Sequence, residues 1–238
     1  TPLYDGWSLD FWFMTEDREF VLPSRLDTVE QKLHLSPNLC VTTRVRDKNV
    51  SLTSEVWLGM ANQVPELNIR VTAETGPAGW LVTALRPYNP EGIQFIEKVA
   101  ADTAGSDWLV NGRSGLRFGE TPEAVFFSNY DAGDVIHQLK KTTHKNAESC
   151  RVGMATAAAL FPARGTGRRT IDHRMTLESE LPRRHLFTAG PSDAAWRDSL
   201  AGTATVSVPD EKIQFLYDAA IRSLFLLSAR EIVPGPYT

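Results

Sequence analysis

Acidic side chains beside predicted turns are the residues of this sequence best suited to general acid–base chemistry. The chain has 29 Asp and Glu residues among 238. Hydrolysis of a glycosidic bond needs two carboxyl groups about 5 to 9.5 Å apart. Sequence does not pair carboxylates across strands, and a loop carboxylate is ordinarily a solvated turn residue, so no residue is assigned a catalytic role. The candidates in or near loops are Glu91, Glu97, Asp107, Glu120, Glu123, Asp131 and Asp134.

The segment 86–92 (RPYNPEG) combines polar side chains with a stiff backbone. Arg86, Tyr88 and Asn89 could hydrogen-bond sugar hydroxyls, which would make this a carbohydrate-facing or interdomain loop. The competing interpretation is a rigid turn that leaves a strand. In that case the following proline orders Asn89 and a carboxylate holds Arg86.

Tryptophan side chains supply a second means of contacting sugars, because an exposed indole can stack on a sugar ring. Trp80 and Trp108 lie beside predicted turns and are candidates for this role. Trp12 and Trp57 lie inside strand patterns and are expected in the core. Packing in the core is also the usual role of an aromatic residue in a sandwich, so both interpretations stay open for Trp80 and Trp108.

Metal, nucleophile and phosphate motifs are not recognised in the sequence. No histidine pair has the i, i+4 spacing of a zinc site, no G-x-S-x-G elbow occurs, and residues 165–169 (GTGRR) lack the Lys-Ser/Thr pair of a phosphate loop. We therefore expect no metal and no cofactor. Cys40 and Cys150 lie in apolar runs, which favours buried free thiols over a disulfide. The five histidines are His34, His137, His144, His173 and His185.

Composition and charge narrow the classes of partner. The net charge is −4 and 42% of the residues are hydrophobic, as in ordinary globular proteins. This charge offers no broad positive field for phosphates or anionic lipids, so we expect neither nucleic acid nor a membrane as partner. No apolar run is long enough to cross a bilayer. A soluble protein, in the bacterial cytoplasm, is the expected setting.

Alternation of apolar and polar residues with period two dominates the first three quarters of the chain, which predicts an all-β fold. In residues 67–74, Leu67, Ile69, Val71 and Ala73 share one face, as in a half-buried antiparallel strand. So many strands without intervening helices predict two packed antiparallel sheets. The predicted strands are 28–35, 39–46, 50–58, 67–75, 80–86, 93–99, 108–110, 124–128, 135–139, 150–161 and 170–177, with a hairpin tip at 163–169 and an irregular connection at 181–192.

A long helix is predicted near the C-terminus, to about Ile232. Residues 207–211 (SVPDE) contain a capping hydroxyl, an early proline and first-turn acids. One apolar stripe runs along the helix and a second apolar surface accompanies it, more than one sandwich needs to cover. A second packing partner is therefore expected, or a homodimer that covers the excess. The stripe comprises Ile213, Leu216, Tyr217, Ala220, Ile221, Leu224 and Leu227, and the second surface Phe215, Ala219, Leu226 and Ala229.

Two patches of the sequence resemble a known family. The run 210–238 (DEKIQFLYDAAIRSLFLLSAREIVPGPYT) is similar to the linker that joins an N-terminal super-sandwich to an (α/α) six-hairpin toroid in bacterial glycoside hydrolases related to glucoamylase and the disaccharide phosphorylases. Residues 85–93 (LRPYNPEGI) are similar to a strand-end motif of these sandwiches. The aromatic and Arg-Asp residues that open the toroid in this family are not in the sequence.

The resemblance implies a large two-sheet sandwich of the super-sandwich, galactose-mutarotase-like type over residues 1–206. A linker helix and the start of a connector would occupy 207–238. The sandwich would pack on the toroid, which carries the catalytic carboxylates, so this chain is expected to be inactive alone. We keep two alternatives, a stand-alone carbohydrate-binding sandwich and a structural sandwich that dimerises through the helix.

Overall fold

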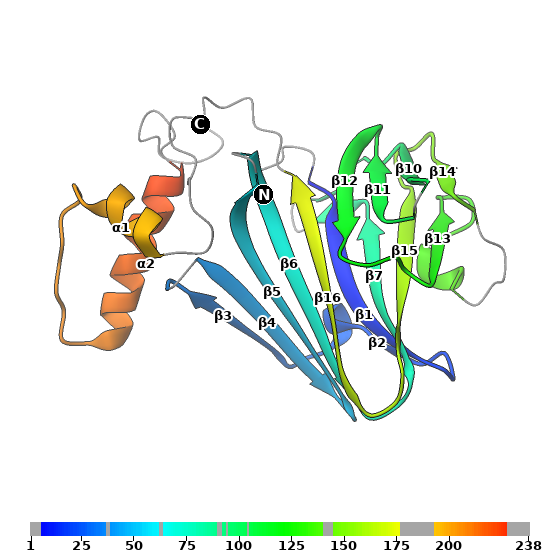
Figure 1. The fold of residues 1–238 in the computed structure, drawn as a ribbon, viewed down its shortest axis with the longest axis horizontal. Coiled ribbons are helices and arrows are strands. Elements are labelled where there is room, and N and C mark those ends of the chain that lie inside the picture. Colours follow the sequence, from blue (N-terminus) through cyan, green and yellow to red (C-terminus); the bar gives the residue numbers. More distant parts are fainter. Residues whose placement is uncertain are drawn as a thin grey trace.

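Two antiparallel sheets packed face to face make up most of the structure (Figure 1). The structure is a computed structural model, and it describes residues 6–36, 39–61, 64–89, 92–93, 95–103, 105–139, 145–176 and 193–227. The five-stranded sheet has the order β13 (Ala124–Ser128), β15 (Thr156–Ala163), β7 (Gly79–Arg86), β1 (Ser8–Thr15) and β2 (Phe20–Val21). The nine-stranded sheet has the order β14 (Ala147–Ser149), β10 (Lys98–Ala101), β11 (Asp107–Val110), β12 (Arg113–Phe118), β16 (Gly167–Thr176), β6 (Val64–Thr75), β5 (Val50–Ala61), β4 (Cys40–Asp47) and β3 (Val29–His34). The prediction of an all-β, two-sheet antiparallel fold is confirmed.

The main core lies between the two sheets and follows from the alternation of the strands. On β6, Ile69, Val71 and Ala73 are buried, whereas Arg70 between them is exposed. Aromatic rings fill the centre of the core: Trp108 meets Phe118 edge-on at 5.0 Å between ring centroids, and Phe118 meets Phe161 at 5.4 Å. The period-two pattern therefore identified which face of β6 is buried.

A second core covers the outer face of the five-stranded sheet. Here Val135 and Leu139 pack with Trp12, Val82 and Leu160. The segment that supplies this cover contains the 3₁₀ helix η2 (Val135–His137). Because both of its faces are covered, β7 is apolar almost throughout, and Gly79, Leu81, Val82, Thr83, Ala84 and Leu85 are all buried.

Three predicted strands have different structures. The segment 135–139 is not a strand, because the Asp134 carboxylate accepts a hydrogen bond from the Ile136 amide at 3.0 Å and starts the turn of η2. The segment 150–161 turns at 150–153, where Gly153 has a φ of +70°, and the strand begins at Thr156. The segment 93–99 contains the end of β9 (Gly92–Ile93), which pairs with β8 (Tyr88–Asn89), and the start of β10.

The hairpin between β15 and β16 has a shorter tip than the predicted 163–169, because β15 extends to Ala163 and β16 begins at Gly167. This hairpin carries the chain from one sheet to the other. Cys40 and Cys150 are both free thiols, as predicted. The irregular connection predicted at 181–192 lies outside the described residues.

Two helices follow the sheets, α1 (Asp193–Leu200), which was not predicted, and α2 (Glu211–Leu227). The cap of α2 is Asp210, whose carboxylate accepts hydrogen bonds from the amides of Lys212 and Ile213 at 2.9 and 3.0 Å. Ser207, the predicted capping hydroxyl, precedes that position. The predicted helix is confirmed to Leu227, and its continuation to Ile232 lies outside the described residues.

The helices lie beyond the β3 edge of the nine-stranded sheet, away from β13 and β14 (Figure 1). A further 3₁₀ helix, η1 (Pro23–Arg25), follows the short β2. No helix in the described part of the chain combines the length and the apolar character that a bilayer crossing requires.

Candidate functional site

Arg86, at the end of β7, is the centre of a half-buried charge cluster. Its guanidinium lies 3.4 Å from an Asp10 carboxylate oxygen on β1 and 2.5 Å from Asp134, the residue that caps η2. The arginine side chain is 15% exposed, and those of Asp10 and Asp134 are 24% and 25% exposed. The cluster joins the end of β7, the central strand of the five-stranded sheet, to the segment that covers the outer face of that sheet.

Two aromatic rings complete the surroundings of Arg86. The guanidinium carbon lies 5.3 Å from the ring centroid of buried Trp12 and 4.8 Å from that of Tyr88. Burial raises the pKa of the Asp10 carboxyl, against the opposing attraction of Arg86. Burial likewise raises the pKa of the Tyr88 phenol. Tyr88 is therefore a neutral, partly exposed phenol held against a cation.

The surface just beyond this cluster is apolar. Tyr88 is 39% exposed and pairs across β8 and β9 with Ile93, which is 54% exposed. Phe95, three residues after Gly92, is 64% exposed and packs against Gly153, where an added Cβ would lie 2.4 Å from the Phe95 ring. An exposed aromatic group of this kind suits contact with another protein surface or a ligand.

The structure brings only some of the predicted site residues together. Arg86 and Tyr88 lie together, but Arg86 is held by carboxylates, as the rigid-turn interpretation requires. Trp80 lies elsewhere on β7, half-buried, with its indole N–H donating to Glu123 at 2.8 Å. Trp108 is fully buried in the main core and does not reach the surface. The backbone of Asn89 lies in β8, and its side chain lies outside what the structure describes.

Trp57 is the residue that sequence reasoning placed wrongly. We expected it in the core, but β5 turns Val50, Leu52 and Val56 inward, so Trp57 points to the opposite, outer face of the sheet and is half-buried there. The alternation of β5 contained this signal, because Trp57 has the parity of the polar Ser51, Thr53 and Glu55.

A groove opens between the sheets, where β1 and η1 face β4, β5 and β6. Its volume is about 250 Å³. Apolar side chains of β1, β4 and β5 line it, together with the polar residues Asp10, Ser24, Thr43 and Ser54. The apolar lining includes Leu9, Phe11, Val45, Leu52 and Val56.

Asp10 and Asp134 do not form a hydrolytic pair, although two carboxylates meet here. Both bind Arg86, and Asp134 also accepts from the Ile136 amide. A glycosidase needs one carboxyl group free to protonate the leaving oxygen and another free to act on the sugar or on water. Here the carboxylates hold the arginine and cap the turn, so the arrangement is structural.

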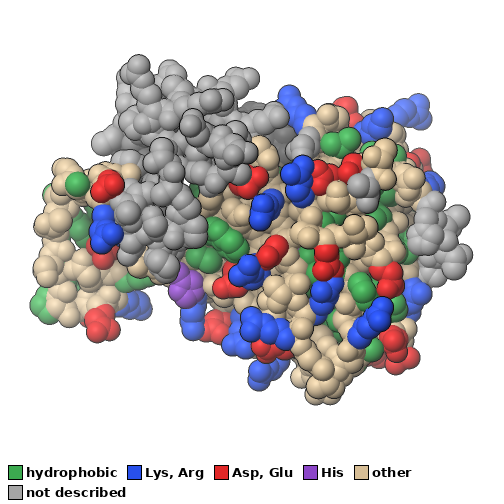
Figure 2. All heavy atoms as spheres, viewed as in Figure 1, with side chains coloured by type: hydrophobic (Ala, Val, Ile, Leu, Met, Phe, Trp, Pro, Cys, Tyr) green, Lys and Arg blue, Asp and Glu red, His purple; other side chains and the backbone are tan. Residues whose placement is uncertain are grey.

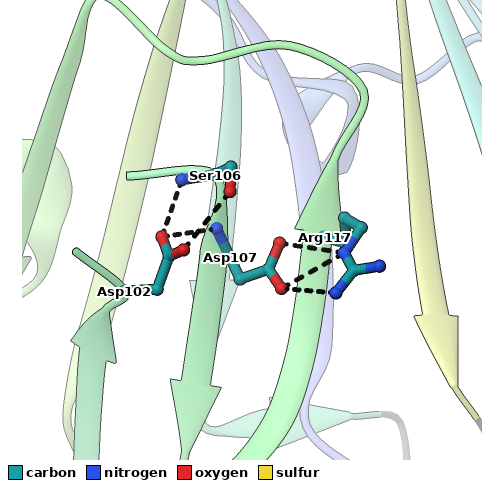
Figure 3. A network of polar contacts seen from close by, with 4 residues as sticks. All are labelled: Asp102, Ser106, Asp107 and Arg117. Atoms are coloured by element: carbon teal, nitrogen blue, oxygen red, sulfur yellow. Dashed lines mark hydrogen bonds and ion pairs between the residues drawn. The ribbon is translucent and has the colours of Figure 1, made fainter. Parts of the chain in front are cut away.

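Two further carboxylates, those of Asp102 and Asp107, are likewise engaged by other groups (Figure 3). Asp102 accepts from the amides of Ser106 and Asp107 at 2.7 and 3.0 Å and so closes the turn from β10 to β11. Asp107 binds the Arg117 guanidinium at 2.9 to 3.2 Å. Within the described residues, no three His, Cys, Asp or Glu side chains lie close enough together to hold a metal ion.

Comparison with known proteins identifies the fold. No protein-family model matches the chain, and no curated protein matches its sequence. A bacterial glucoamylase solved in complex with acarbose is similar in structure, with a TM-score of 0.52 and 12% identity over 72% of this chain. A family GH92 α-mannosidase from Bacteroides thetaiotaomicron aligns over 91% of the chain at 10% identity, but its TM-score of 0.31 does not establish a shared fold. The chain spans 27% and 31% of the length of these two proteins. The likeness to the glucoamylase shows that this chain shares the fold of part of that protein.

Proposed function

We propose that this chain is an accessory β-sandwich domain of a glycoside hydrolase, and that its helix α2 packs against a helical catalytic domain. The shared fold with part of a bacterial glucoamylase supports the carbohydrate-active class. The orientation of α2 supports the packing role and is the observation on which the proposal depends.

Gln214 and Tyr217, three residues apart on one side of α2, hydrogen-bond the segment that precedes the helix. The Gln214 side chain accepts from the Val208 amide at 2.8 Å and donates to Asp218 at 3.1 Å. The Tyr217 hydroxyl donates to the Ala204 carbonyl at 2.7 Å. These contacts fix the segment before the helix along one side of it.

Part of the predicted apolar stripe of α2 faces outward, whereas Tyr217 and Ile221, which also belong to it, are half-buried. Ile213, Leu216 and Leu224 are 53%, 57% and 51% exposed, and Ala220 between them is also exposed. Steps of three and four residues place these side chains in one row along the helix. Full burial of each large aliphatic side chain is worth roughly 1.5–3 kcal/mol, so covering this row would stabilise a complex substantially.

Another helix is the partner that suits this row. Side chains three and four residues apart form the ridges that interlock when two helices pack. A helical domain beside the sandwich, as the resemblance of residues 210–238 implies, would supply such helices. The proposal assigns catalysis to that domain, because the carboxylates described above are bound by arginine or by backbone amides.

Reading the coding sequence beyond Thr238 tests the proposal. Several hundred residues with helical periodicity and acidic residues in the connecting loops are expected. A stop codon shortly after Thr238 would overturn it. Hydrolysis of maltooligosaccharides or nitrophenyl glycosides by the purified chain would overturn the assignment of catalysis to another domain.

Self-association distinguishes the proposal from a dimer built through α2. Sedimentation of the chain over a range of concentrations should show no stable dimer. A dimer that is abolished by Leu216→Glu would instead identify a second copy of the chain as the cover of α2.

A further inference from the structure

The outer face of the nine-stranded sheet carries an indole in polar surroundings. The strands that build this face pair in register, with Trp57 on β5 opposite Cys40 on β4 and Asn68 on β6. In the next row Glu55 lies opposite Arg70, and Arg70 lies opposite Asp172 on β16. Figure 2 views the molecule from this side and shows acidic and basic side chains next to one another with hydrophobic side chains among them.

One side of the indole is occupied by Arg70. The guanidinium carbon lies 5.8 Å from the centroid of the Trp57 ring. Arg70 is itself held by Asp172, with two hydrogen bonds of 2.7 and 3.1 Å. Such a paired arrangement fixes the plane of the guanidinium and limits the freedom of the neighbouring ring.

The charges of Arg70 and Asp172 balance one another. The Arg70 guanidinium lowers the pKa of the Asp172 carboxyl, which stays ionised at neutral pH. The pair therefore presents oriented N–H and carboxylate groups without an unpaired charge. An anionic ligand would have to displace Asp172 from Arg70, whereas a neutral ligand with hydroxyl groups could bind beside the pair.

The other side of the indole is next to Gly59, which follows two residues after Trp57 on the same face of β5. Gly59 has no side chain, and an added Cβ would lie 2.8 Å from the Asn68 amide nitrogen. Asn68 leans over Gly59 and donates to the Glu66 carbonyl at 3.3 Å. The amide thus lies over Gly59, and β5 places no side chain of its own next to the indole at that position.

We propose that Trp57, Asn68 and Arg70 form a binding platform for a neutral oligosaccharide on the outer face of the nine-stranded sheet. A pyranose presents C–H groups on its faces and hydroxyls at its rim. The indole would stack on the C–H face, and the amide and guanidinium would hydrogen-bond the hydroxyls. The regular pairing of β4, β5, β6 and β16 keeps this surface continuous, which suits an extended chain of sugars.

The choice of carbohydrate as the ligand rests in part on the proposed function, whereas the location of the site rests on the geometry around Trp57. The proposed function and the binding platform can therefore be disproved independently of each other. A helical domain encoded after Thr238 with no sugar binding to this chain would leave the proposed function standing. Sugar binding at Trp57 with no such domain would leave the platform standing.

Titration of the 238-residue chain with maltoheptaose and with cellohexaose tests the platform. Isothermal calorimetry should give a dissociation constant in the micromolar to millimolar range. In ¹⁵N-labelled protein, the indole resonance of Trp57, assigned with Trp57→Phe, should shift more than those of the other five tryptophans. Trp57→Ala should weaken binding by about tenfold or more, a loss of about 1.4 kcal/mol.

Trp80→Phe is the matched control, because Trp80 is also half-buried but lies on the five-stranded sheet. It should bind sugar as the parent chain does. Asn68→Ala and Arg70→Gln serve if Trp57→Ala does not fold, and each should weaken binding. The proposal is overturned if neither sugar binds at about 10 mM, if Trp57→Ala binds unchanged, or if a different indole carries the shift.

Discussion

Thr83 on β7 and His173 on β16 form a hydrogen bond across the main core, with 2.7 Å between the hydroxyl oxygen and the imidazole Nε2. The bond links the five-stranded to the nine-stranded sheet, and Phe11, Phe118 and Phe161 surround the imidazole. Thr83 is fully buried and His173 is 1% exposed. This polar contact therefore lies where the two sheets meet.

Acid should weaken the fold through His173. Burial lowers the pKa of His173 from 6.5 to about 4. Between these two pH values the unfolded chain binds a proton at this histidine and the folded chain does not. The contribution of neutral His173 to the free energy of unfolding is therefore complete above pH 6.5 and is lost as the pH falls toward 4. The loss is on the order of 3 kcal/mol. Urea unfolding at pH 7 and pH 4.5 measures it, and His173→Gln should show a clearly smaller difference between the two pH values.

Removal of the Arg86 guanidinium should destabilise the protein. Arg86→Met leaves Asp10 and Asp134 partly buried without their cation, at a cost of about 2–4 kcal/mol. Arg117→Met is the control, because the Arg117 side chain is 66% exposed and its pair with Asp107 should be worth less than about 1 kcal/mol. Equal losses in the two variants, measured by denaturant unfolding, would contradict the structural role of the Arg86 cluster.

Substitution of Trp108 should reveal a core residue. Trp108→Ala removes a fully buried indole and should cost about 3–5 kcal/mol. Trp108→Phe should cost much less, because the buried indole N–H has no hydrogen-bond partner in the described structure. Thermal unfolding gives both values, and a change in sugar binding caused by Trp108→Phe at unchanged stability would contradict this assignment.

Polar substitution on the apolar row of α2 should leave the free chain folded. Leu216→Glu and Leu224→Glu alter side chains that are 57% and 51% exposed, so each should change the free energy of unfolding by less than about 1 kcal/mol. Association with a helical domain expressed as a separate chain should be lost. Lys212→Glu, an exposed change at a polar position of the same helix, is the control and should preserve that association.

Local pattern was sufficient to predict the fold class and most strands. Residues 67–75 alternate because one face of β6 is buried and the other meets solvent, and this information resides in the segment itself. The same holds for α2, whose period and first-turn acids predict a helix. Segment 135–139 was predicted wrongly because its apolar residues pack on a sheet surface as a turn, and an apolar run alone does not distinguish that from a strand.

Tertiary structure alone decided which residues meet. Asp10, Arg86 and Asp134 are far apart in the chain, and the pairing of β1 with β7 and the position of η2 bring them together. Trp108 and Trp57 both lie in strands, yet one is the centre of the core and the other is on the outer face, because each sheet has one face toward its partner. Sequence determines how a segment alternates, but the order of the strands and the packing of the two sheets determine what each face touches.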